Sequence, residues 1–460
     1  MVFKATIAET GETTGDLSGS VAISLPATNI SGTADVTFNT ATGAFTTVID
    51  NGVITMLGQQ ITADEIAISN DPNADNFTIS VTAPTAHFGD GETNWITATS
   101  DQLSSFTVAP AGTTANIANL AISTNIPGLE LSGTVSLAVD STGDNTQFEI
   151  AGTGLMLSVL GQTLAGDFTF QQVTTDQKAD TPAGRNIVSA TIANGSLSLL
   201  KGESPPPSFV TVSNLTGNGL FTDDGLVADV SGDAMFNLPS NVAAANASVT
   251  LTINTLESAI DETIGNGAVM ISAAAGPYLK IEADPLTLSI DGTFDLTGRI
   301  AFEQLERTNN FGATEKVMFL TLQSATMTID GQGIEEGSGA FVILDSGIAG
   351  TAAGKASIAA AGFAANASIG LRINNTGQVV DETINALGGT FQIEFGPGEE
   401  NVNEFFGAGF GLTIGDFLSI SGNVSFSDAG NGKQLFGATD ATLFVGQGPL
   451  HLYEGRAEIN

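Results

Sequence analysis

The chain has 460 residues and a net charge of −37, because 49 acidic residues outnumber 12 basic ones. Phosphate recognition needs clustered lysine and arginine, so this charge excludes a nucleic-acid-binding protein. An anionic membrane surface would repel the chain for the same reason. No stretch approaches the roughly 18 apolar residues of a transmembrane helix, so we do not expect an integral membrane protein.

The apolar composition predicts strands. Hydrophobic residues make up 42% of the chain, which is enough to build a core. Most are Ala, Val, Ile, Leu and Phe, and 55 glycines with many Thr, Ser, Asn and Asp are interspersed among them. β-Branched residues fit a pleated sheet, and Gly, Asn and Asp tolerate tight turns. We therefore predict an all-β fold. The absence of cysteine excludes disulfides, thiolate metal sites and a cysteine nucleophile.

The first predicted element is a strand that recurs four times, with alternating apolar residues followed by Asn or Asp. Period-two alternation places the apolar side chains on one face of a strand. The closing Asn or Asp is predicted to cap its own backbone in a turn, with a ligand role as the alternative. In chain order the copies are Ala34, Val36 and Phe38 with Asn39; Val135, Leu137 and Val139 with Asp140; Val249, Leu251 and Ile253 with Asn254; and Ile369, Leu371 and Ile373 with Asn374.

The third and fourth copies belong to a longer repeat. Residues 244–264 (AANASVTLTINTLESAIDETI) match residues 364–384 (AANASIGLRINNTGQVVDETI) at 12 of 21 positions without a gap. The offset is 364 − 244 = 120 residues. Chance does not produce such a match, so the chain contains internal repeats.

The second predicted element is a hairpin that alternates with the first. Its copies begin at Leu57, Leu160, Ile290 and Gly415, and each has a Gly-containing turn followed by alternating apolar residues. The alternation ends in a pair of buried anchors, predicted to be Ile66/Ile68, Phe168/Phe170, Ile300/Phe302 and Val424/Phe426.

The two elements together divide the chain into four predicted β repeats. These cover residues 1–75, 76–185, 186–310 and 311–460, the last with additional C-terminal strands. The favoured architecture is an elongated repetitive array of stacked strands, either solenoid-like or a long meander. Tandem β-sandwiches are the alternative, although immunoglobulin-like sandwiches usually carry a core Trp or Tyr and this chain has one Trp and two Tyr.

The residues that most often carry catalysis form no recognisable constellation, and we predict that the chain is not an enzyme. His87 and His451 are isolated and are expected at the surface. The repeated DETI contains adjacent carboxylates, but neighbours on a strand point to opposite faces, so they do not form the facing pair of a glycosidase. We predict a repeated turn at DETI instead.

A calcium site is the best metal candidate. In DPNADN, the residues Asp71, Asn73 and Asp75 match the first ligand positions of a calcium loop. However, Asn76 replaces the turn glycine, and Thr82 stands where a bidentate Glu belongs. A weak, calcium-stabilised site is therefore the only cofactor that the sequence suggests.

Strands such as SGTVSLAVDS alternating with hairpins such as LGQTLAGDFTFQQ resemble the β-strand repeats of very large bacterial surface and adhesin-type proteins. The resemblance implies an exported stalk or filament segment and carries over no catalytic or binding residue. The expected function is a non-catalytic structural protein, extracellular or at the cell surface, that associates with itself or with surface and matrix partners. The alternative is a glycan- or cell-surface-binding module that uses the aromatic residues Trp95 and Tyr453.

Overall fold

The computed structural model confirms the all-β prediction. Its described residues form strands and turns, and none of them lies in a helix. The structure describes residues 2–7, 13–25, 28–70, 76–90, 93–143, 146–177, 184–200, 208–238, 242–244, 246–264, 267–290, 294–308, 314–329, 332–344, 346–360, 363–386, 389–414, 418–428 and 434–445.

The chain divides into two compact units. Unit 1 comprises Met1–Leu197, Ser213–Val230 and Thr252–Pro277, and unit 2 comprises Ser198–Val212, Ser231–Leu251 and Tyr278–Asn460. The four-repeat division remains a prediction.

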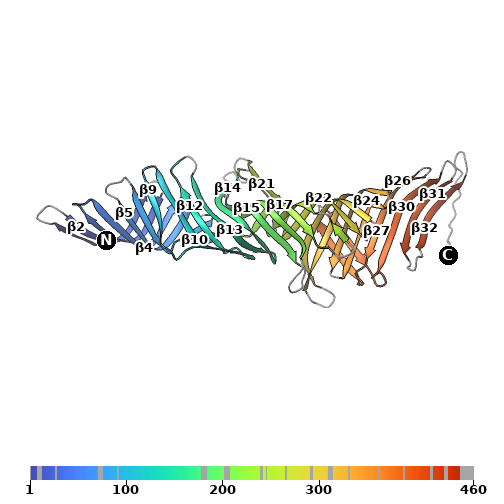
Figure 1. The fold of residues 1–460 in the computed structure, drawn as a ribbon, viewed down its shortest axis with the longest axis horizontal. Helices are drawn as coiled ribbons and strands as arrows, with labels where there is room; N and C mark the ends of the chain where they lie inside the picture. Colours follow the sequence, from blue (N-terminus) through green and yellow to red (C-terminus); the bar gives the residue numbers. More distant parts are fainter. Residues whose placement is uncertain are drawn as a thin grey trace. The chain divides into compact units, whose positions relative to one another are not determined.

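Unit 1 is an antiparallel meander in which most long strands pair with the next one along the chain (Figure 1). The strands up to β17 are β1 (Val2–Ile7), β2 (Thr13–Leu25), β3 (Thr28–Asn39), β4 (Ala44–Met56), β5 (Gln59–Asn70), β6 (Phe77–Thr82), β7 (Thr85–Gly89), β8 (Asn94–Thr99), β9 (Ser104–Ala109), β10 (Gly112–Thr124), β11 (Leu129–Ser132), β12 (Thr134–Asp140), β13 (Gln147–Val159), β14 (Gln162–Thr174), β15 (Asn186–Leu200, of which Ser198–Leu200 lies in unit 2), β16 (Ser208–Phe221, of which Ser208–Val212 lies in unit 2) and β17 (Leu226–Phe236, of which Ser231–Phe236 lies in unit 2). A separate two-stranded sheet is formed by β20 (Ile260–Ile264) and β21 (Val269–Ala273).

The short strands of unit 1 are long strands that a break divides in two. β6 and β7 both pair with β5, and β11 and β12 both pair with β13. In the same way, β8 and β9 both pair with β10. The meander order is therefore kept through these breaks, which favours the predicted array over tandem sandwiches.

Unit 2 repeats this plan, and consecutive long strands pair from β22 to β27 and from β30 to β32. Its strands are β18 (Val242–Ala244), β19 (Ala247–Asn254, of which Thr252–Asn254 lies in unit 1), β22 (Tyr278–Ile290), β23 (Phe294–Thr308), β24 (Thr314–Ile329), β25 (Gln332–Leu344), β26 (Gly347–Ala360), β27 (Phe363–Asn374), β28 (Val380–Ala386), β29 (Gly389–Phe395), β30 (Val402–Ile414), β31 (Leu418–Asp428) and β32 (Gln434–Val445).

Burial follows the alternation that the sequence predicts. Three of the four predicted anchor pairs are buried, namely Ile66/Ile68, Phe168/Phe170 and Ile300/Phe302. The rings of Phe168 and Phe170 stack with their centroids 5.9 Å apart. The side chains of the fourth pair, Val424/Phe426, lie outside the described part of the structure.

The predicted hairpin turns are confirmed at Leu57 and Leu160. In both turns, Leu and the Gly after it have positive φ, 50° and 80° in the first, 48° and 72° in the second. A two-residue turn with two positive φ angles matches the twist of the strands that it joins. Glycine adopts this conformation without strain, whereas leucine rarely does.

β-Bulges form a line across the middle of the long strands, which the sequence did not predict. Register shifts occur at residues 152/155 and 165/167 in unit 1 and at residues 297/299, 322/325 and 335/338 in unit 2. A bulge bends its strand and increases the local twist. Glycines lie on this line because adjacent backbones approach closely there: a Cβ on Gly195 would lie 2.8 Å from Leu215 Cβ, and one on Gly298 would lie 2.7 Å from Ala325 Cα.

A methyl group on the bulge line is expected to destabilise unit 2. A Cβ on Gly339 would lie 2.7 Å from the Cα of Ala352, so the backbone itself must move. We expect Gly339→Ala to lower the free energy of unfolding by about 2 kcal/mol, measured by urea denaturation. Gly396→Ala is the matched control, because nothing lies closer than 3.9 Å to its Cβ position. Equal effects of the two substitutions would contradict this steric explanation.

The four closing Asn and Asp residues make the predicted turn caps. Each accepts a hydrogen bond from the backbone N–H two residues later, which is an Asx turn. The donors are Ala41 to Asn39 (2.8 Å), Thr142 to Asp140 (2.9 Å), Leu256 to Asn254 (2.9 Å) and Thr376 to Asn374 (3.0 Å). The hydroxyl and N–H of Thr142 also lower the pKa of the Asp140 carboxyl.

The prediction of a turn at DETI is wrong. Asp261 and Glu262 lie in β20, and Asp381 and Glu382 lie in β28. Each DETI forms one strand of a two-stranded hairpin, paired with β21 or β29. The turn signal of the acidic pair is overridden because apolar residues beside it are buried, namely Ile260 and Ile264 in the first segment and Val380 in the second.

In unit 2 this hairpin covers the outer face of the meander. Val380, Ile393 and Phe395 are buried against Phe319 and Val342. Strands β24 to β26 are therefore apolar on both faces where the hairpin lies, which explains the unbroken apolar run FVIL in β25.

Candidate functional site

Most of the residues predicted as sites fall outside the described residues. These are the calcium candidates Asp71, Asn73 and Asp75, together with Tyr453. Within the described ranges, no group of three or more His, Asp or Glu side chains could hold a metal ion. The calcium site therefore remains a prediction.

Trp95 lies on β8 and is 4% exposed, so it is not the open stacking surface that the sequence suggested. Its backbone carbonyl accepts hydrogen bonds from the Asn125 N–H (2.8 Å) and the Thr124 hydroxyl (2.9 Å). The next residue, Ile96, is also buried, so both faces of the strand are covered at this point. The indole Nε1 is buried and has no hydrogen-bond partner among the described residues.

Trp95 nevertheless lines a polar pocket of about 190 Å³ in unit 1. The polar part of its wall includes carboxylates, a guanidinium, an amide and a hydroxyl. Besides Trp95, the pocket is lined by the polar residues Asp90, Arg185, Asn186, Thr222 and Asp223.

Hydrogen bonds between strands hold this wall in place. The Asn186 amide nitrogen donates to the Asp90 carbonyl (3.2 Å), and the Asn186 amide oxygen accepts from the Thr174 hydroxyl (2.9 Å). The Gln172 side chain donates to the Gly89 carbonyl (2.6 Å). The start of β15 and the end of β7 are therefore linked, although 96 residues separate Asn186 from Asp90.

Arg185 connects the pocket to the hairpin of unit 1. Its Nε lies 3.5 Å from a carboxylate oxygen of Glu262 on β20. The hairpin is also fixed by the Asp176 N–H, which donates to the Thr263 carbonyl (2.7 Å), and by the Gly267 N–H, which donates to the Asp176 carboxylate (2.8 Å). The guanidinium thus stands at a defined place on the rim.

His87 is part-buried on β7 rather than at the open surface. Its Nε2 lies 3.0 Å from the Thr62 hydroxyl, and desolvation lowers its pKa. The imidazole is therefore a neutral packing group at neutral pH. His451 lies outside the described residues.

Comparisons with known protein families and with curated proteins give no match for this chain. None of these residues forms a helix long and apolar enough to cross a membrane.

The sequence pointed to Trp95 but not to the residues around it. Asp90, Asn186 and Asp223 are far apart in the chain and follow no motif. They come together through strand pairing, which a single sequence does not specify. The only sequence feature that indicated this site was that Trp95 is the single tryptophan of the chain.

Proposed function

We propose that the chain is a non-catalytic structural module of an extracellular or cell-surface assembly, such as a stalk, an adhesin segment or a filament subunit. The observation that carries this proposal is the meander of strands, each paired with its neighbour in the chain, found in each unit by itself. Each strand adds about 4.8 Å in the direction of the hydrogen bonds. Such an array gains length simply by adding strands, as repeat proteins do.

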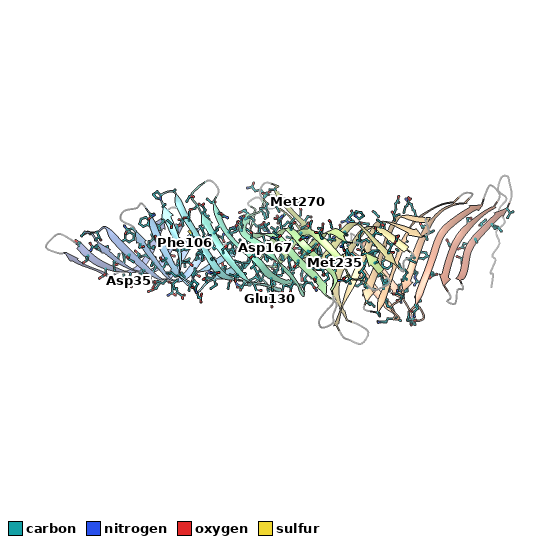
Figure 2. The ribbon with its side chains drawn as sticks, in the orientation of Figure 1. Asp35, Phe106, Glu130, Asp167, Met235 and Met270 are labelled. Atoms are coloured by element: carbon teal, nitrogen blue, oxygen red, sulfur yellow. The ribbon has the colours of Figure 1, made fainter. Side chains whose placement is uncertain are left out.

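The acidic surface supports the same proposal. Carboxylates alternate with buried apolar residues along the strands and point to solvent, as Asp35 and Glu130 do in contrast to the buried Phe106 (Figure 2). Asp16, Asp64 and Asp295 are exposed in the same way. Like charges on a repetitive sheet oppose its association sideways with other copies. Acidity of this kind suits an abundant, repetitive protein outside the cell.

Small-angle X-ray scattering of the full chain tests the proposal. A compact protein of this length has a radius of gyration of roughly 23 Å. We expect a value well above that, with a distance distribution that has a long tail, because a spacer must span distance. A radius of gyration near the compact value would contradict the proposed role.

A further inference from the structure

The pocket beside Trp95 is more than a structural link between strands, because a structural link needs no open space between its polar groups. Its wall combines hydrogen-bond donors with acceptors, although one of them, the Asp90 carboxylate, also accepts from the Thr93 N–H (2.6 Å). A buried N–H without a partner costs free energy, and Trp95 Nε1 has no partner among the residues that the structure describes. A small pocket with an aromatic wall and converging polar groups is the form that a ligand site takes.

The mixed charges of the wall disfavour a ligand with a net charge of either sign, because each such ligand meets at least one group of its own sign. Asp90 and Asp223 oppose an anion, and the carboxylate of Glu262 stands beside the rim. Arg185 opposes a cation, because its guanidinium is always charged. A neutral molecule that both donates and accepts hydrogen bonds meets neither penalty.

The size of the pocket limits which neutral ligands can bind. At about 190 Å³ it holds roughly six water molecules at liquid density, which is less room than a drug-sized ligand needs. A single sugar ring fits this space. Its hydroxyls can donate to carboxylates and accept from a guanidinium or an amide, while its C–H groups contact the indole.

We propose that this pocket binds one neutral sugar residue, with Asp90, Asp223, Arg185 and Asn186 as hydrogen-bonding groups and Trp95 as the apolar wall. This site is separate from the proposed structural role, and it would give the array a means of holding a carbohydrate. The sugar can be free or can be the end of a glycan, because the same hydroxyls are presented in both cases.

Fluorescence measures binding at this site directly, because Trp95 is the only tryptophan of the chain. We expect glucose, galactose or mannose to change its emission saturably, with a dissociation constant of about 1 mM. Glucuronic acid and glucosamine, which carry opposite charges, should leave the emission unchanged at the same concentrations. No response to any of the three neutral sugars, or a response to a charged sugar alone, would overturn the proposal.

A matched pair of variants locates the site. Both Asp223 and Asp224 are exposed, but only Asp223 lines the pocket. Asp223→Asn should therefore weaken binding at least tenfold, whereas Asp224→Asn should not change it. Equal affinities of the two variants would overturn the assignment, and a melting temperature equal to that of the native chain would establish that each variant is folded. An oligosaccharide that ends in the same sugar distinguishes a free sugar from the end of a glycan as the ligand. If it binds more tightly than the free sugar, the ligand is the end of a glycan. If the two bind equally, the ligand is the single sugar.

Discussion

Asn374→Ala is expected to destabilise unit 2 by about 3 kcal/mol. The side chain is 1% exposed and donates to the carbonyls of Gln378 (2.9 Å) and Glu399 (2.8 Å). It also accepts from the N–H (3.0 Å) and hydroxyl (2.7 Å) of Thr376. Alanine would remove the partner of the buried Thr376 N–H and of two part-buried carbonyls at once, and a buried group left unpaired costs roughly 1–3 kcal/mol. Urea denaturation of the variant measures the loss.

Asn39→Ala is the matched control for this prediction. Asn39 occupies the same position of the repeated strand and makes the same kind of turn, but it is only part-buried. We expect it to cost no more than about 1 kcal/mol, because water can replace the lost bonds. Asn254→Ala should resemble Asn374→Ala, since Asn254 is 0% exposed and also donates to two carbonyls. If Asn374→Ala lowered the free energy of unfolding as little as Asn39→Ala does, the hydrogen bonds of Asn374 would not be the source of its stabilising effect.

Glu303→Gln is expected to remove a pH dependence from the stability of unit 2. Glu303 lies on β23 between Lys280 and Phe319, and desolvation raises its pKa from 4.5 to about 7 although Lys280 opposes the shift. The folded state therefore holds this proton more tightly than the unfolded state. Its stabilising contribution is complete below pH 4.5 and is lost as the pH rises through about 7.

The variant should thus match the native protein below pH 4.5 and exceed its stability above pH 7 by on the order of 3 kcal/mol. Urea denaturation between these limits gives the difference curve, in which the other carboxylates cancel. Glu335→Gln, at an exposed position of β25, is the matched control. A flat difference curve for Glu303→Gln would show that the folded and unfolded states bind this proton equally tightly, which would contradict the raised pKa of Glu303.

The alternation and turn chemistry of the sequence predicted much of this fold. Strand faces, anchors such as Phe168 and Phe170, and the four Asx turns follow from local pattern and appear in the structure. The positions of the β-bulges could not be predicted from the local sequence pattern, because a bulge depends on how two strands pair. Asp167 illustrates this: it accepts from Gly154 of β13 (3.0 Å) and Asn194 of β15 (2.7 Å), partners that only strand pairing brings to it.

The DETI error has a related cause. Two adjacent acids are typical of a turn, yet Ile260 and Ile264 gain more from burial in the hairpin than the acids gain from a turn. The candidate site was predicted only at Trp95. Its polar partners come from β15, from the β16–β17 turn and from the end of β7, and their meeting is a consequence of tertiary structure.

Hydrogen exchange of the Gly339→Ala variant tests the central claim most directly. In a serial array of strands, stability is shared mainly between neighbours, so a local defect should have a local effect. We predict that protection falls most in β24 to β26, less in β23 and β27, and is unchanged in β2 to β5 of unit 1. A uniform loss of protection throughout the chain would contradict the array and indicate a single cooperative globule.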